Sequence, residues 1–195
     1  MKTPEIREKL GELFSYTEAV AAGLSRRRLY ALRDDGVLTV VGGGLYRFSD
    51  APPADLDLIE IAEKAPLATL CLETALAHHD LVDAIPVATN VAIPRGSTRP
   101  RLRAAHRLHH FDPATFELGR ETIEVGARRP LGLYSAERSL VDVVRLRHDQ
   151  GPDQAWEALR RWLARSGREP AKLLQMAKHF SGAEAPLRAA LEVLL

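Results

Sequence analysis

The chain has 195 residues, 46% of them hydrophobic and 27% charged, which is typical of a soluble globular protein of one or two domains. No apolar run approaches the ~20 residues that cross a bilayer, and a single cysteine excludes an internal disulfide, so we expect a cytoplasmic protein with no membrane partner. The net charge of +1 neither indicates nor excludes nucleic-acid binding. The distribution of the charges along the chain therefore has to decide.

The first fifty residues read as helices followed by a hairpin. Residues 3–13 have apolar side chains at helical spacing, with Thr3 as the cap. A short helix over 16–22 ends at Gly23, and Ser25 caps a further helix from Arg26 to Asp35. Two helices joined by a glycine turn within this length predict a helix-turn-helix.

The packing needs of a helix-turn-helix are met. Ala19 supplies the small residue in the first helix, and Leu29 and Leu32 face inward on the second, although Glu18 stands where an apolar residue is more usual. The opposite face of the second helix then presents Arg27 and Tyr30 near its N-terminal end, the end that meets base edges. The flanking arginines, at 26, 28 and 33, suit phosphates.

Two β-rich runs, 37–41 and 45–48, enclose three glycines and predict a hairpin, which makes the motif a winged helix-turn-helix. The glycine tip would approach a phosphate backbone. The alternative is a solvated helix face beside a sheet edge. We favour DNA binding because cap, packing residues, arginines and hairpin agree. The candidate DNA contacts are Ser25, Arg26, Arg27, Arg28, Tyr30, Arg33, Gly43 and Arg47.

A proline pair in residues 50–54 predicts a linker, and hence a DNA-binding domain over 1–50 and a second domain over 55–195. The second part begins with helices over 55–64 and 70–79, the latter including a buried Cys71.

A strand over 87–93 is followed by a basic stretch that contains no acid up to Phe111. We expect a loop over 95–101 and then a strand. The stretch is interpreted in three ways: a solvated loop, a second contact with the DNA backbone, or a surface for an acidic partner. Its arginines are Arg95, Arg99, Arg101, Arg103 and Arg107.

Short strands over 123–125 and 131–134 precede an amphipathic helix capped by Ser135. Within that helix Arg138 and Asp142 are four residues apart, a spacing that favours a local salt bridge. Three further helices begin near prolines 152, 170 and 186. The predicted fold class is α+β, with a winged helix-turn-helix, a larger α+β domain and a helical C-terminal tail.

Enzyme motifs are missing from the sequence. None of the five lysines has an acid two residues earlier, as a restriction-type nuclease site needs, and Gly96-Ser97 lacks the following Asp-x-Asp of a nucleotidyltransferase. The histidine pairs at 78–79 and 109–110, with His106, have nothing that fixes a zinc geometry. We therefore expect no enzyme activity, no metal and no other cofactor.

The segments LETALAHHDL, VATNVAIP followed by RG, and above all LGLYSAERSLVDVVRLRH, together with the predicted winged helix, resemble the AbiEi family of type IV antitoxins. The segment from Ser135 to Asp142 looks like that family's S-x-E-R-T-L-x-D, with Ser139 in place of threonine. The resemblance covers nearly the whole chain. It implies a head that binds promoter DNA and represses its own operon, with Arg27 and its neighbours at the DNA. It also implies a second domain that counteracts a nucleotidyltransferase-type toxin.

Two functions therefore remain open at this point. One is a DNA-binding antitoxin and autorepressor. The other is a free-standing winged-helix regulator whose second domain senses a ligand or dimerises.

Overall fold

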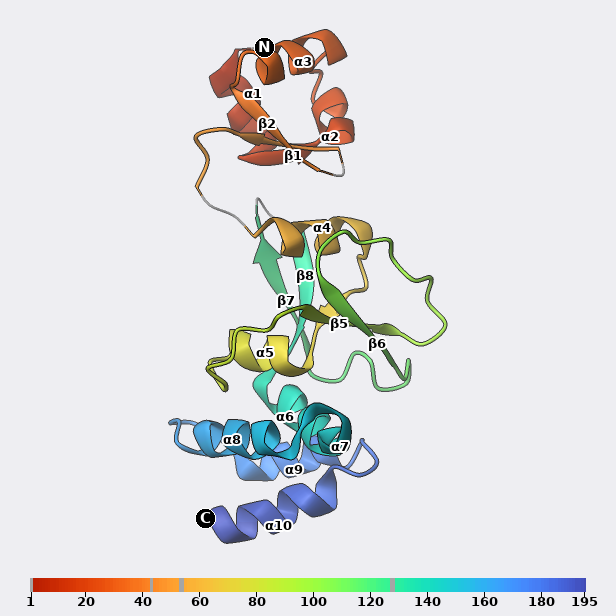
Figure 1. Cartoon of the computed structure of the whole chain (residues 1–195), viewed down its shortest axis with the longest axis vertical. Coiled ribbons are helices and arrows are strands. Elements are labelled where there is room, and N and C mark those ends of the chain that lie inside the picture. The colour runs from red at the N-terminus through yellow and green to blue at the C-terminus, as the bar shows by residue number, and fades with distance from the viewer. Residues whose placement is uncertain (1, 43, 53–54, 127–128) are drawn as a thin grey trace.

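The structure, a computed structural model, describes residues 2–42, 44–52, 55–126 and 129–195. Three tiers follow one another along the molecule (Figure 1): a small unit at the N-terminal end, a five-stranded sheet in the middle, and a group of helices at the C-terminal end. We call residues 1–50 the head and residues 55–195 the body. In the described part of the chain, no helix has the length and apolar character needed to cross a membrane.

The head contains three helices and a three-stranded antiparallel sheet of order β1-β3-β2. Its elements are α1 (Thr3–Leu10), β1 (Leu13–Ser15), α2 (Tyr16–Ala21), α3 (Arg26–Asp34), β2 (Leu38–Gly42) and β3 (Leu45–Phe48). Side chains from all of them form one apolar cluster around Phe14, Leu29 and Leu32. The predicted helix-turn-helix and hairpin are both present, within one residue or two of the predicted bounds.

Two details of the head differ from the sequence-based expectation. The first helix ends at Leu10 because Gly11 adopts a φ of 71°, and the chain then enters β1, which pairs with β3. Lys2, and not Thr3, occupies the N-cap position, with the Glu5 carboxylate accepting a hydrogen bond from its backbone N–H. A three-residue strand is too short to produce a period of two, so the periodicity of the sequence could not predict β1.

The body begins with α4 (Leu56–Lys64) and holds a five-stranded sheet of order β6-β5-β4-β8-β7. The strands and the second helix are β4 (Thr69–Leu70), α5 (Leu72–His78), β5 (Thr89–Pro94), β6 (His106–Phe111), β7 (Arg120–Val125) and β8 (Arg129–Tyr134). β4 is central, antiparallel to β5 and parallel to β8. The helix predicted over 70–79 begins two residues later, at Leu72. Cys71 lies at its N-cap position and is fully buried, as expected.

The helical tier covers one end of the sheet (Figure 1). It comprises α6 (Ala136–Arg145), α7 (Arg147–Gln150), α8 (Pro152–Leu163), α9 (Pro170–Ala177) and α10 (Glu184–Leu194). Ser135 caps α6 as predicted, its hydroxyl accepting from the Arg138 N–H at 3.2 Å. Every residue of α6 from 138 to 144 is buried, so α6 is the central helix of this tier and not a half-exposed one.

Arg138 and Asp142 form the predicted salt bridge, with Nε and Oδ2 2.9 Å apart and both side chains fully buried. The guanidinium also donates to the carbonyl oxygens of Thr115 and Leu118, at 2.7 and 2.6 Å. Its face packs on the ring of Tyr134, 4.1 Å from the centroid. The arginine thus fixes the β6–β7 connection to α6, a longer-range role than the i, i+4 spacing alone implies.

The head and the body share an apolar cluster, because Leu13 and Leu45 of the head pack with Ile59 and Val125 of the body. Arg129, at the start of β8, crosses the same boundary. It pairs with Glu63 of α4, bonds the Leu13 carbonyl oxygen at 3.3 Å, and pairs with Glu18 of α2 at 2.8 Å. These contacts hold the helix-turn-helix against the sheet of the body.

Arg129→Met is expected to loosen this boundary. The apolar stem is retained, while two carboxylates and a carbonyl oxygen lose their donor, at a cost of about 1–3 kcal/mol in the free energy of unfolding. We expect a lower urea midpoint and faster proteolytic cleavage of the linker. Arg160→Met, at an exposed position on α8, is the matched control. Equal urea midpoints and cleavage rates in the two variants would show that Arg129 does not hold the head.

Candidate nucleic-acid interface

The exposed face of α3 is the strongest candidate site, and its local geometry follows from a cap and two leucines. The Ser25 hydroxyl accepts a hydrogen bond from the Arg28 N–H at 3.3 Å and starts the helix. Leu29 and Leu32 are 0% and 2% exposed, which anchors one face in the head core. The helix α3 lies at the end of the molecule farthest from the helical tier (Figure 1).

Arg27 and Arg28 lie in the first turn of α3 and are exposed. Among the residues that the structure describes, no carboxylate pairs with either guanidinium. Both charges lie at the positive end of the helix dipole, beside backbone N–H groups that have no intrahelical acceptor. The first turn of α3 therefore offers a concentrated positive charge to an anion such as a DNA phosphate.

Tyr30 is half-buried against the head core and is flanked by two arginines. The Arg26 Nε donates to the Tyr30 hydroxyl at 3.2 Å, and the Arg33 guanidinium lies 4.7 Å from the ring centroid. Arg33 also pairs with Asp34 at 2.7 Å, and that hydrogen bond raises the pKa of Arg33. Arg26 and Arg33 therefore both lie against Tyr30, on one side of the helix.

The β2–β3 hairpin supplies the wing. Gly44 has a φ of 81°, which favours glycine, and a Cβ at this position would meet no atom within 4 Å. Val40 on β2 is 47% exposed. Gly43, predicted as the tip that approaches the phosphate backbone, lies outside the described residues.

Arg47 is placed differently from the expectation. Its Nη2 donates to the carbonyl oxygens of Ala51 and Pro52, so the guanidinium holds the start of the linker. This position does not support a contact between Arg47 and DNA. Residue type could not predict this contact, because both acceptors are backbone carbonyl oxygens.

The second basic segment lies on the body, in the β5–β6 connection and on β6. Arg95, Arg99, Arg101, Arg103 and Arg107 are all exposed. The neighbouring histidines have other partners: His109 bonds the Asn90 side chain at 3.0 Å, and His106 the Ala104 carbonyl oxygen at 2.8 Å. No three His, Cys, Asp or Glu side chains within the described ranges converge as a metal site would require.

The sequence did not predict the contact between Glu18 and Arg129, which joins the helix-turn-helix to the body. Glu18 accepts a hydrogen bond from the Ser15 N–H at 2.6 Å while the Ser15 hydroxyl accepts from the Glu18 N–H, which is a capping box. Its other role is the ion pair with Arg129. The Ser-x-x-Glu spacing in the sequence predicts this capping box and explains why an acid stands at this position. The sequence does not predict the partner on β8, Arg129.

The order α1-β1-α2-α3-β2-β3 with the sheet order β1-β3-β2 defines a winged helix-turn-helix, a fold that many DNA-binding regulators use. Residues 1–49 match the protein family described as "Transcriptional regulator, AbiEi antitoxin". The resemblance seen in the sequence is thus confirmed for the head. The family description is that of a transcriptional regulator and antitoxin.

Among solved structures, the chain is similar to the crystal structure of the RV2827C protein from Mycobacterium tuberculosis. The TM-score is 0.52 at 18% sequence identity, and the match covers 97% of this chain and 78% of that one. At this identity the likeness concerns the fold alone, and it agrees with the α+β class. The search of curated proteins gave no match.

Proposed function

We propose that the chain is a DNA-binding antitoxin that represses the promoter of its own operon and counteracts a nucleotidyltransferase-type toxin, directly or indirectly. The observation that carries the proposal is the first turn of α3, where Arg27 and Arg28 face solvent with no carboxylate of the described residues beside them. The family match of this same segment supports both the regulatory and the antitoxin part.

In the proposed complex α3 enters the major groove of double-stranded promoter DNA with its N-terminal end toward the bases. Arg27 reads a base edge, for which a guanidinium suits the two acceptors of guanine. Arg26, Arg28 and Arg33 bind phosphates on either side, while Ser25 and Tyr30 fix the helix start and the position of Arg26. The wing, with Gly43 in its tip, contacts the backbone next to the groove.

The two activities are assigned to different parts of the chain: DNA binding to the head, and toxin neutralisation to the body. Neither part needs a cofactor or catalyses a reaction in this scheme, and both act in the cytoplasm, where promoter DNA lies. The shared cluster and Arg129 couple the two parts mechanically, so the tests use the full chain.

The proposal predicts that a gene for a nucleotidyltransferase-type toxin lies beside the gene of this chain. It is tested by co-expressing the full chain with that toxin, together with a reporter under the chain's own promoter. We expect growth to recover and the reporter to be repressed. A variant with alanine at Arg26, Arg27 and Arg28 should still restore growth but release the reporter.

Repression without rescue by the wild-type chain would instead identify a free-standing regulator whose body senses a ligand or dimerises. Loss of rescue in the folded arginine variant would mean that neutralisation depends on DNA binding, and the division between head and body would be wrong.

A further inference from the structure

A cleft of about 340 Å³ lies at the boundary between the head and the body. The wing lines it through Val41 and Leu45, and α4 of the body lines it through Ile59 and its neighbours. These three apolar residues belong to, or pack against, the cluster that the head and the body share. The cleft therefore has an apolar surface to which both parts contribute, and its size is at the lower end of the ~300–1,000 Å³ of small-molecule sites.

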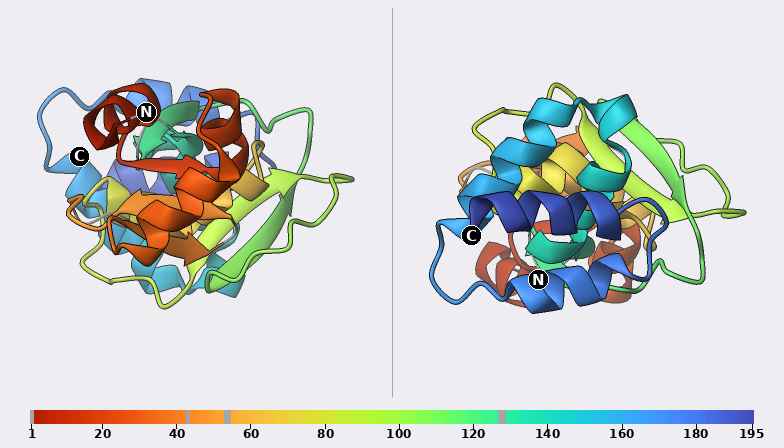
Figure 2. Two further views of the ribbon diagram at one scale, coloured as in Figure 1. Left: turned by 90° about the horizontal axis from the view of Figure 1, so that it is seen from above. Right: turned by 90° about the horizontal axis from the view of Figure 1, so that it is seen from below.

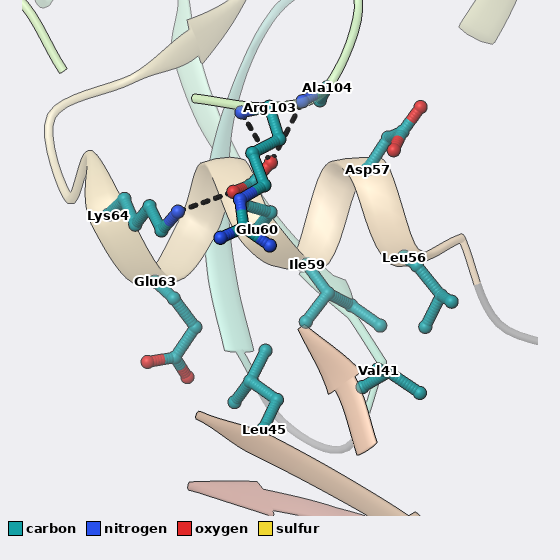
Figure 3. Close-up of a pocket in the computed structure, with 10 residues that line it drawn as sticks. All are labelled: Val41, Leu45, Leu56, Asp57, Ile59, Glu60, Glu63, Lys64, Arg103 and Ala104. Carbon is teal, nitrogen blue, oxygen red and sulfur yellow. Dashed lines mark hydrogen bonds and ion pairs between the residues drawn. The ribbon is translucent and has the colours of Figure 1, made fainter. Parts of the chain in front are cut away.

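Arg103 reaches this cleft from the connection between β5 and β6. The connection, drawn in yellow-green, extends far out on one side of the molecule in both views of Figure 2. Where it returns to α4, the backbone N–H groups of Arg103 and Ala104 donate to the Glu60 carboxylate, both at 2.9 Å. Figure 3 shows the Arg103 side chain extending from there toward the strands that carry Val41 and Leu45. Because backbone groups make the anchoring contacts, the guanidinium is left to bind a ligand at a low entropic cost.

The acids around the cleft already have partners or point elsewhere. Glu60 pairs with Lys64, and Glu63 pairs with Arg129. Although partial burial acts to raise the pKa of Glu60, the hydrogen bonds from Lys64 and from the two backbone N–H groups hold that pKa below its ordinary value. In Figure 3 the Asp57 carboxylate points away from the apolar residues of the cleft. These carboxylates therefore do not neutralise Arg103.

The Arg103 guanidinium is exposed, and within the described ranges no carboxylate pairs with it. A guanidinium binds a carboxylate through two parallel hydrogen bonds, and the apolar surface beside it suits a hydrocarbon group. A phosphate ester carries up to two negative charges and is repelled more strongly by Glu60 and Glu63 than a single carboxylate is. The chemistry of the cleft thus favours an organic acid with an apolar body.

We propose that this cleft binds a small amphipathic carboxylate, with the carboxylate group on Arg103 and the hydrocarbon body on Val41, Leu45 and Ile59. The inference goes beyond the proposed function, because neither DNA nor a toxin takes part in this binding. Since the ligand contacts both the wing and α4, its binding fixes the wing against the body and makes the position of the wing dependent on an organic acid.

The test uses the full chain without DNA, and octanoate as the probe, followed by isothermal titration calorimetry. We expect saturable binding at one site, with the negative heat-capacity change that marks apolar burial. Octylamine has a similar hydrocarbon chain with the opposite charge, and acetate has the carboxylate without the chain. Each should bind at least ~10-fold more weakly than octanoate, because it lacks one of the two contacts.

Three variants assign the binding to the cleft. Arg103→Met retains the apolar stem and should weaken octanoate binding ~10-fold or more. Arg99→Met, at an exposed arginine of the same connection that does not line the cleft, is the matched control and should bind like the wild type. Leu56→Glu adds a carboxylate to the cleft and should abolish binding. The first turn of a helix favours an acid, so this variant should fold, which a thermal melt checks.

Equal affinity for octanoate in the wild-type chain and in Arg103→Met, equal binding of octanoate and octylamine, or no saturable binding would overturn the proposal. Methyl NMR spectra should show shifts at Val41, Leu45 and Ile59 on addition of octanoate. Shifts confined to Ile85 and Val87, which are 91% and 94% exposed and lie outside the cleft, would show adventitious hydrophobic binding and would also overturn it. Because the assay contains no DNA, failure of the proposed function leaves its outcome unchanged.

Discussion

Alanine at Arg26, Arg27 and Arg28 is expected to weaken binding to the promoter segment by ~100-fold or more, because the first turn of α3 loses one base contact and two phosphate contacts. Arginine and alanine are both good helix formers, and the anchoring leucines are untouched, so the helix should remain folded. The measurement is a fluorescence-anisotropy titration at several salt concentrations, with thermal melts of each variant.

The single variants should separate the two kinds of contact. Arg27→Ala is expected to reduce the preference for the promoter over random DNA by about 1–3 kcal/mol, whereas Arg28→Ala should weaken both duplexes and lower the salt slope by about 1. A control variant with alanine at the exposed residues Arg160, Arg168 and Arg188 carries the same change in net charge at the other end of the molecule. A comparable loss of DNA affinity in that control would show that the effect comes from total charge and not from the first turn of α3.

The second large effect is expected in the stability of the body. Arg138→Met removes the guanidinium that pairs with Asp142 and holds the carbonyl oxygens of Thr115 and Leu118. Because all of this lies in the core, breaking the pair should lower the free energy of unfolding by about 3–5 kcal/mol. Urea unfolding followed by circular dichroism measures it.

Two further variants locate the origin of that loss. Asp142→Leu should be similarly costly, and it also removes the Asp142 carboxylate that pairs with Arg145 at 2.7 Å. The double variant should cost less than the sum, because neither Arg138 nor Asp142 is then left buried without the other. Arg188 forms an i, i+4 pair with Glu184 at 2.8 Å, but on the surface, so Arg188→Met should cost ~1 kcal/mol or less. Equal losses at the buried and the exposed pair would contradict the role given to Arg138.

The local structure of the head was predictable because each feature that determines it involves residues only a few positions apart. A serine cap, a glycine turn and two leucines one turn apart determine α3. A glycine-rich turn between a β-branched run and an aromatic-rich run determines the hairpin. β1 and β4 were missed because two or three residues carry no period, and their identity as strands comes from partners far away in the sequence.

The candidate site shows the same division. Arg27 and Arg28 could be assigned to the exposed surface of α3 from the helical spacing around Leu29 and Leu32. The position of Arg47 at the linker carbonyls, and the three-way contact of Arg129 between head and body, depend on tertiary structure that no local pattern encodes. For Arg138 the sequence predicted the partner but not the burial, which arises because α5, α8, α9 and α10 pack against α6.

Recognition of its own promoter by this chain is tested by a competition titration. The full-length protein is titrated at physiological salt with the segment upstream of its gene and with a scrambled duplex of equal length. We expect binding to the promoter segment at least ~1,000-fold tighter than to the scrambled duplex. Equal affinity for the two duplexes, or no binding to either, would show that the chain does not recognise its promoter.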